Sequence, residues 1–203
     1  YNNSVNIMNN LISFVPRNVK IVFPSTHLIF ENCKKNKQVF YESSKALTKL
    51  AYARGKLECE NILKRNKNNY TILRLGSVYG YAEKSRMINL PNLFALRAKM
   101  NLDLKLYSKG VQIKSIISSK DVARAMVFFS KKKFNRELFH FASEHISVKK
   151  IGKFCKKYNK KIKLIPTNDK IPYLGYYINC NKLIKTGFRF KNYYKDFIKD
   201  YLK

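Results

Sequence analysis

The stretch VKIVFPSTHLIF, residues 19–30, decides the fold. Its first five residues are rich in β-branched and aromatic side chains, which is typical of a buried parallel strand. Pro24 is expected to stop this strand, because proline lacks the backbone N–H that a strand donates. The hydroxyls of Ser25 and Thr26 should therefore lie at the carboxyl end of the strand.

Helices and strands alternate on both sides of this stretch. Apolar spacing predicts helices over 5–15 and 47–63, and residues 70–75 form a second strand that Gly76 closes. Further along, the pattern predicts helices over 90–100, 121–130, 148–158 and 192–202, and strands over 105–107, 111–117, 138–141 and 164–166. Asp121 is expected to cap the helix that it begins. This order predicts an α/β fold, a partial Rossmann-like doubly wound parallel sheet with helices on both faces and a smaller α+β part toward the carboxyl end.

The composition is that of a packed, strongly basic protein. The 203 residues are 45% hydrophobic, and 42 Lys and Arg against 12 Asp and Glu give a net charge of +30. No stretch approaches the roughly 20 unbroken apolar residues of a membrane span, so we expect a cytoplasmic chain without a membrane partner. The basic residues are dispersed, and an A/T-biased genome would encode the same excess of Lys, Asn, Ile, Tyr and Phe. This disfavours nucleic acid as the partner, although a polyanion-binding module stays open as a function of another class.

The four cysteines show no spacing that suits a metal or a disulfide framework. Cys33, Cys59, Cys155 and Cys180 are far apart and form no Cys-x-x-Cys pair. We therefore expect reduced thiols and no metal site.

The sharpest local motif is YARGK, residues 52–56. Tyr52 and Lys56 are four residues apart in a predicted helix, so they share one face about one turn apart. An ammonium beside a phenol favours the phenolate and lowers the pKa of the tyrosine. Tyr52 could then exchange a proton with a substrate hydroxyl or carbonyl, while the alternative for the pair is an ordinary solvated helix face.

Five matches in sequence order carry a family resemblance. They are YNNSVN (1–6), the strand and helix pair VFPSTHLIF (22–30) and YARGKLECE (52–60), ILRLGSVYG (72–80), GVQIKSIISSKDVA (110–123) and NKLIKTGF (181–188). Together they resemble the extended short-chain dehydrogenase/reductase family, the NAD-dependent epimerase/dehydratase group that acts on nucleotide sugars. The likeness covers essentially all 203 residues. It implies hydride transfer to or from the nicotinamide of NAD or NADP, a nucleotide-sugar substrate and assembly as a homodimer.

The resemblance also implies roles for particular residues. Tyr52 would be the general acid/base, Thr26 would hydrogen-bond the reacting oxygen, and Lys56 would tune Tyr52 and hold the nicotinamide ribose. The implied catalytic residues are Thr26, Tyr52, Lys56 and Asn3. The implied cofactor-binding residues are Ser25, Tyr52, Lys56, Ser77, Val78 and Tyr79, and the implied substrate-binding residues are Thr26, Asn89 and Lys114.

Several substitutions depart from the family pattern, and two of them concern the implied site. Lys114 stands where the family usually has a diphosphate-binding Arg, and a lysine supplies a point charge without the bidentate fork. His27 follows Thr26 where the sugar dehydratases of this group have Asp-Glu, which argues against a dehydratase. A structural role for His27 and a contact with substrate both remain open.

The largest departure is the absence of a Gly-x-Gly-x-x-Gly motif. We therefore expect that the chain is a fragment or a natural truncation without the first βαβαβ half. This chain alone should then bind NAD(H) poorly. Residues 1–80 and 112–143 would be the remainder of the NAD(P)-binding domain, and 81–111 and 144–203 the substrate-binding part. The expected function is that of an NAD(P)-dependent nucleotide-sugar epimerase/oxidoreductase, and the sequence does not separate an epimerase from a reductase. The nearest alternative is a 4-ketoreductase of the dehydrorhamnose-reductase type, whose Ser-Thr-Asp-x-Val-Phe segment is similar to residues 25–30.

Overall fold

A parallel sheet forms one end of the protein in the computed structural model, which describes residues 2–35, 37–82, 87–169, 171 and 174–203. The strand order is β1 (Ile21–Thr26), β3 (Tyr70–Leu75) and β7 (Glu137–Phe141). Phe23 lies opposite Ile72, and Ile72 lies opposite Leu138. The predicted strands over 70–75 and 138–141 are confirmed almost residue for residue.

The first strand is longer than the sequence predicts. β1 continues through Pro24 to Thr26, with Pro24 opposite Leu73. Pro24 is tolerated because β1 is the outermost strand of this sheet among the described residues, and an outer strand can lose one N–H donor without breaking a ladder. The expectation that Pro24 stops the strand is therefore wrong, but Ser25 and Thr26 do lie at the strand's carboxyl end.

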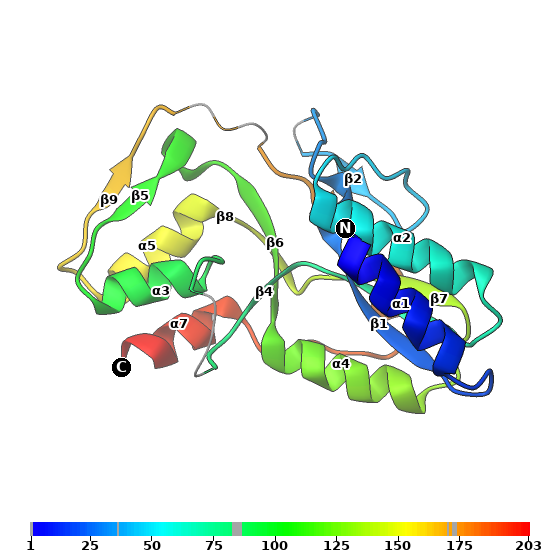
Figure 1. Cartoon of the computed structure of the whole chain (residues 1–203). Helices are drawn as coiled ribbons and strands as arrows, with labels where there is room; N and C mark the ends of the chain where they lie inside the picture. The colour runs from blue at the N-terminus through cyan, green and yellow to red at the C-terminus, as the bar shows by residue number, and fades with distance from the viewer. Residues whose placement is uncertain (1, 36, 83–86, 170, 172–173) are drawn as a thin grey trace.

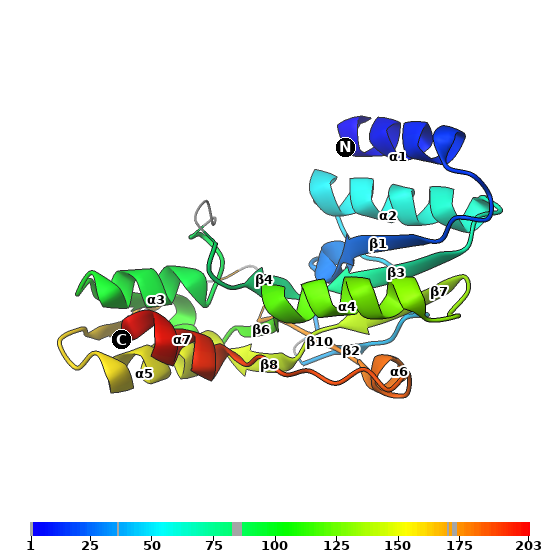
Figure 2. The same cartoon turned by 90° about the horizontal axis from the view of Figure 1, so that it is seen from below.

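Helices cover both faces of this sheet (Figure 2), as the prediction of a doubly wound fold requires. The helices α1 (Asn2–Phe14) and α2 (Ala51–Arg65) lie on one face, and α4 (Ser119–Lys131) lies on the other. Side chains alternate accordingly along the strands. Phe23 and Ile72 join the cluster of Met8 and Cys59, whereas Leu73 joins a separate cluster on the α4 side.

A second sheet begins where β3 ends. Gly76 separates β3 from β4 (Ser77–Tyr79), and a Cβ at Gly76 would lie only 2.8 Å from the carbonyl oxygen of Ser115. β4 pairs in parallel with β6 (Ile113–Ser118), which pairs antiparallel with β8 (Glu144–Ser147). Glycine at position 76 thus lets the chain leave one sheet and enter the next in close contact with β6.

Three helices surround the second core (Figure 1). They are α3 (Asn92–Lys99), α5 (Val148–Tyr158) and α7 (Tyr194–Leu202), and Phe94, Ile151 and Ile198 are buried between them. Shorter elements complete the described chain: η1 (His27–Phe30), β2 (Val39–Phe40), β5 (Leu104–Leu106), η2 (Tyr107–Gly110), β9 (Leu164–Pro166), β10 (Tyr177–Ile178) and α6 (Asn181–Ile184). β5 pairs with β9 and β2 pairs with β10. In the ranges described, no helix combines the length and apolar character needed to cross a bilayer.

Two predicted helix starts are wrong because of hydrogen bonds with segments that are distant in the sequence. α2 begins at Ala51 rather than 47, because the Leu47 N–H donates to the Ile29 carbonyl at 2.7 Å and the Glu31 carboxylate accepts from the Lys49 N–H at 2.9 Å. These bonds to η1 and its flank hold residues 47–49 outside the helix.

Asp121 is not the cap of α4. Ser118 is the cap, since its hydroxyl oxygen accepts from the Lys120 N–H at 3.2 Å. The buried Asp121 carboxylate instead accepts from the backbone N–H groups of Lys191 at 3.0 Å and Asn192 at 2.9 Å. Asp121 therefore ties α4 to the segment that leads into α7.

Candidate active site

The two hydroxyls at the end of β1 have different partners. The Ser25 hydroxyl donates to Glu60 Oε1 at 2.6 Å, and both residues are buried. Thr26 Oγ1 accepts from the Leu28 N–H at 3.2 Å and so begins η1. A threonine hydroxyl has one hydrogen to donate and two lone pairs, so the Thr26 bond to Leu28 leaves its hydrogen available.

Tyr52 and Lys56 lie one turn apart on α2, as the motif predicts. Tyr52 is 56% exposed. The Lys56 ammonium donates to the Pro24 carbonyl at 2.9 Å and lies 4.7 Å from the centre of the Phe23 ring. Lys56 thereby joins α2 to β1, two residues before Thr26.

The electrostatic expectation for this pair is wrong. Partial burial raises the pKa of Tyr52 and lowers the pKa of Lys56, because removal from water disfavours the charged form of each group. The motif by itself indicates only the attraction between an ammonium and a phenolate. In the folded chain, burial is the cause of the shift in the pKa of Tyr52 and the largest cause of the shift in the pKa of Lys56.

Asn3 lies exposed in the first turn of α1. The carbonyl of its neighbour Ser4 accepts from Cys59 Sγ at 3.3 Å, so the start of α1 lies beside α2 three residues beyond Lys56. The supporting role implied for Asn3 stays a prediction.

The three predicted site residues of β4 lie in different surroundings. Ser77 lines a cavity described below, Val78 packs against the core on the α4 side, and Tyr79 is 1% exposed. The Tyr79 hydroxyl donates to the Asn192 carbonyl at 3.2 Å, and burial raises the pKa of this phenol. Tyr79 is thus a core residue and Val78 a half-buried one, and the contact with nicotinamide that the resemblance implies for them stays a prediction.

A cavity of about 530 Å³ brings three predicted residues together from separate segments. Ser77 comes from β4, Asn89 precedes α3, and Lys114 lies on β6. Its basic lining residues are Arg97, Lys105 and Lys114, and none of its described lining residues is acidic. Burial lowers the pKa of Lys114. Cations around a pocket of this size suit a phosphorylated small molecule.

Sequence reasoning missed several residues of this region. Arg97, Lys105 and Tyr107 line the same cavity but lie outside the matched motifs. It also missed a buried ion pair behind Ser25, in which Arg74 Nη2 lies 2.7 Å from Glu60 Oε2. The signal in the sequence was the single charged residue of the strand TILRL, because a buried charge needs a charged partner.

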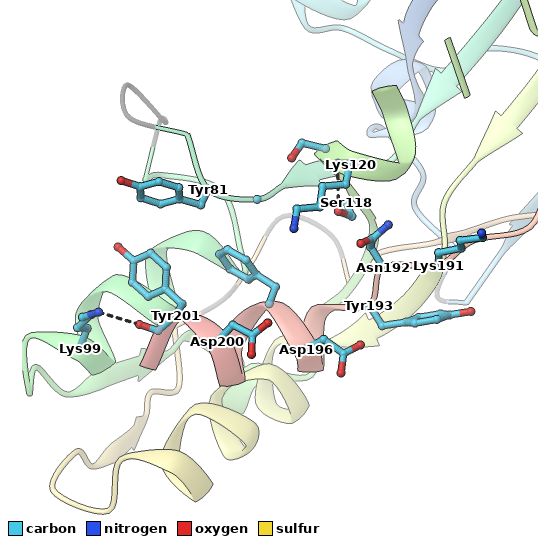
Figure 3. Close-up of a pocket in the computed structure, with 13 residues that line it drawn as sticks. Tyr81, Lys99, Ser118, Lys120, Lys191, Asn192, Tyr193, Asp196, Asp200 and Tyr201 are labelled. Atoms are coloured by element: carbon cyan, nitrogen blue, oxygen red, sulfur yellow. Dashed lines mark hydrogen bonds between the residues drawn. The ribbon is translucent and has the colours of Figure 1, made fainter. Parts of the chain in front are cut away.

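A second and larger cavity, of about 730 Å³, lies between α7 and the ends of α3 and β4 (Figure 3). The rings of Tyr81 and Tyr201 face each other with centroids 6.5 Å apart, and Lys120 and Asn192 lie toward the other end. None of the predicted site residues lines this cavity. Among the described residues, no group of His, Cys, Asp or Glu is arranged to hold a metal ion.

Three solved structures with the same fold act as points of comparison. The UDP-glucose 4-epimerase of Thermotoga maritima, solved with UDP-glucose, is 18% identical with a TM-score of 0.78, covering 98% of this chain and 66% of that one. The UDP-N-acetylglucosamine 4-epimerase of Methanobrevibacter ruminantium, in complex with UDP-N-acetylmuramic acid, is 17% identical with a TM-score of 0.80, covering 99% and 66%. The dTDP-glucose 4,6-dehydratase DesIV of Streptomyces venezuelae, solved with NAD, is 15% identical with a TM-score of 0.78, covering 98% and 63%.

These likenesses show the fold, and the chain spans about two thirds of the length of those proteins. No curated protein sequence matches the chain. The sequence model of the NAD dependent epimerase/dehydratase family matches residues 1–141, more than half of the chain. This match shows, in agreement with the strand-end hydroxyls and the Tyr-x-x-x-Lys helix, that the chain belongs to the NAD dependent epimerase/dehydratase family.

Proposed function

We propose that this chain binds the substrate and moves the proton in an NAD(P)-dependent nucleotide-sugar epimerase. The observation that carries the proposal is the convergence of Ser77, Asn89 and Lys114 on one cavity of about 530 Å³. Small-molecule sites typically measure about 300–1,000 Å³, and the cationic lining favours a diphosphate. Two of the structural neighbours were solved with UDP-linked sugars, which supports the same class of ligand here.

The proton relay we propose consists of Thr26, Tyr52 and Lys56. Thr26 has a hydrogen to donate to a substrate oxygen, and the Tyr52 hydroxyl makes no hydrogen bond to a described residue. Because burial raises the pKa of Tyr52, the phenol is protonated at neutral pH. A protonated phenol can give its proton to a ketone oxygen, and Lys56 positions α2 against β1 for this transfer.

The chain fits the nicotinamide side of a dinucleotide better than its phosphates. Lys56 uses one of its donors on Pro24, so its remaining donors can hold a ribose, and Tyr52 lies one turn away on the same face of α2. A nicotinamide bound there would supply or accept the hydride. The seven glycines of the chain, by contrast, nowhere follow the spacing of the pyrophosphate-binding turn.

Calorimetric titration of the chain with UDP-glucose, with ATP as the comparison nucleotide, tests the substrate class. We expect saturable binding of UDP-glucose that UDP displaces and ATP does not. Lys114→Ala should weaken binding at least roughly tenfold, because a charged hydrogen bond to phosphate is lost. Lys157→Ala removes an exposed lysine of α5 outside the cavity and should change binding less than about twofold. Equal losses in the two variants, or no binding at all, would refute the proposal.

The ketoreductase alternative makes a different prediction about the cofactor. An epimerase uses the nicotinamide twice and consumes none, whereas a reductase oxidises one NAD(P)H for each product. Turnover with stoichiometric oxidation of NAD(P)H, followed by absorbance, would select the reductase.

A further inference from the structure

His27 carries a buried ring nitrogen without a hydrogen bond. The residue is 7% exposed and directly follows Thr26 at the start of η1. Its Nδ1 lies 3.1 Å from the Tyr176 hydroxyl, but its Nε2 has no hydrogen-bond partner within the described ranges. Buried polar atoms in folded proteins are nearly always paired, so an unpaired one needs an explanation.

The bonds of Tyr176 determine which nitrogen of His27 carries the proton. The Tyr176 hydroxyl oxygen is 2.8 Å from the His27 carbonyl oxygen, and a carbonyl can only accept. The single phenolic hydrogen therefore lies in that contact, and Nδ1 must donate its own hydrogen to the phenolic oxygen. Burial, together with the nearby charge of Lys114, lowers the pKa of His27 to about 3, so the ring is neutral. Nε2 is then an unprotonated acceptor.

The space beside His27 has the size of one small polar group. His27, Ser77, Lys114 and Tyr176 are among the residues that line a cavity of about 20 Å³. A volume of roughly 10–15 Å³ suffices for one water molecule, so this cavity admits one water or one hydroxyl but no sugar ring. Ser77 and Lys114 also line the cavity of about 530 Å³, so the two spaces adjoin.

We infer that His27 Nε2 accepts a hydrogen bond from a hydroxyl of the sugar whose diphosphate occupies the adjoining cavity at Lys114. This inference rests on the function proposed above and names a residue that selects for the sugar rather than the nucleotide. A hydroxyl can donate the hydrogen that Nε2 lacks, and Lys114 lies at both cavities to hold the phosphate end of the same ligand. A hexose without a hydroxyl at that point would leave the nitrogen unpaired and would bind less tightly.

The test compares UDP with UDP-glucose on the full 203-residue chain and two variants. The amide of His27→Asn can replace Nδ1 as the partner of Tyr176 but does not reach the place of Nε2. His27→Gln is one methylene longer and places an amide oxygen close to Nε2. The measured quantity is the ratio of the UDP dissociation constant to the UDP-glucose dissociation constant, by calorimetry, with thermal unfolding as the check on folding.

We expect His27→Asn to lower this ratio roughly five- to tenfold while leaving UDP binding within about twofold, since one hydrogen bond is lost. His27→Gln should retain most of the ratio. An unchanged ratio in His27→Asn overturns the inference while leaving the proposed function intact, and equal weakening of both ligands shows a structural role for His27. If the wild-type chain binds neither ligand, the inference and the proposed function both fail.

A second measurement covers the case in which His27→Asn does not fold. In wild-type chain labelled with ¹⁵N-histidine, the Nε2 resonance should have the shift of an unprotonated nitrogen and should move when UDP-glucose is added, but not when UDP is added. A protonated Nε2, or an equal response to both ligands, contradicts the inference.

Discussion

Replacement of Glu60 by methionine should destabilise the protein severely. Glu60 is fully buried on α2, and Arg74 on β3 is 5% exposed. Arg74 reaches the carboxylate through three contacts, Nη2 to Oε2 at 2.7 Å, Nε to Oε1 at 3.0 Å and Nε to Oε2 at 3.2 Å. Glu60→Met keeps the length and helix propensity of the side chain but removes the only carboxylate that these contacts join to Arg74.

The magnitude follows from what remains buried. Breaking a buried ion pair by removing one partner costs about 3–5 kcal/mol, because the other charge stays uncompensated. Arg74 would keep the Glu42 carbonyl at 3.3 Å, and the Ser25 hydroxyl would lose its acceptor. We expect a loss of roughly 4 kcal/mol in the free energy of unfolding, a large fraction of the ~5–15 kcal/mol typical of folded proteins. The damage should centre on the contact between α2 and the end of β1, which carries Thr26.

Urea unfolding followed by far-ultraviolet circular dichroism measures this loss. Glu58→Met is the matched control on the same helix, since Glu58 pairs with Arg65, whose side chain is 70% exposed. That variant should lose less than about 1 kcal/mol. The double variant Glu60→Met with Arg74→Met should be more stable than Glu60→Met alone, because no unpaired charge remains. A Glu60→Met loss no greater than that of Glu58→Met would refute this reasoning.

Two further predictions concern the close contact of Gly175 with β6 and the two buried histidines His27 and His140. Gly175→Ala should lower the free energy of unfolding in urea by at least roughly 2 kcal/mol, because Gly175 has φ +91° and an added Cβ would lie 2.2 Å from the Ile113 carbonyl oxygen. Gly187→Ala is the control, since Gly187 has a similar φ of +87° but open space around an added Cβ. It measures the backbone cost alone and should lower the free energy of unfolding clearly less. Burial lowers the pKa values of His27 and His140 to about 3, below the ~6.5 of an unfolded histidine. Between these pH values the unfolded chain binds protons that the folded chain does not. The contribution of the neutral histidines to the free energy of unfolding is therefore complete above about pH 6.5. It falls as the pH decreases toward 3, by up to roughly 1.4 kcal/mol per pH unit for each histidine. Urea unfolding at pH 7.5, 6.5 and 5.5 should show this decline, with a shallower slope in His140→Phe, and equal slopes in the two proteins would contradict the role of His140.

The strands could be predicted because their evidence is local. Residues 70–75 are rich in β-branched, aromatic and leucine side chains, with Arg74 as the one charge, and the structure has β3 over those residues. The start of α2 could not be predicted in the same way, since the Leu47 N–H is held by a carbonyl 18 residues earlier, at Ile29. Local patterns report propensity, and such bonds between segments override it.

Some features of the candidate site could likewise be predicted from local spacing, and others could not. The position of Thr26 at the end of a strand and the pairing of Tyr52 with Lys56 on one helix follow from spacing alone. The raised pKa of Tyr52 and the core position of Tyr79 depend on burial, which is set by the packing of distant segments. The partner of His27, Tyr176, lies 149 residues away along the chain, and no local pattern connects them.

That separation has a consequence for synthesis on the ribosome. His27 is synthesised 149 residues before Tyr176, and translation adds roughly 5–20 residues per second. His27 therefore lacks its partner Tyr176 for on the order of 10 seconds. During this interval the imidazole is open to water and titrates like any exposed histidine. A nascent chain would therefore be sensitive to acid and to proteolysis near His27 during this interval, and a premature stop before the codon for Tyr176 would make the exposure permanent.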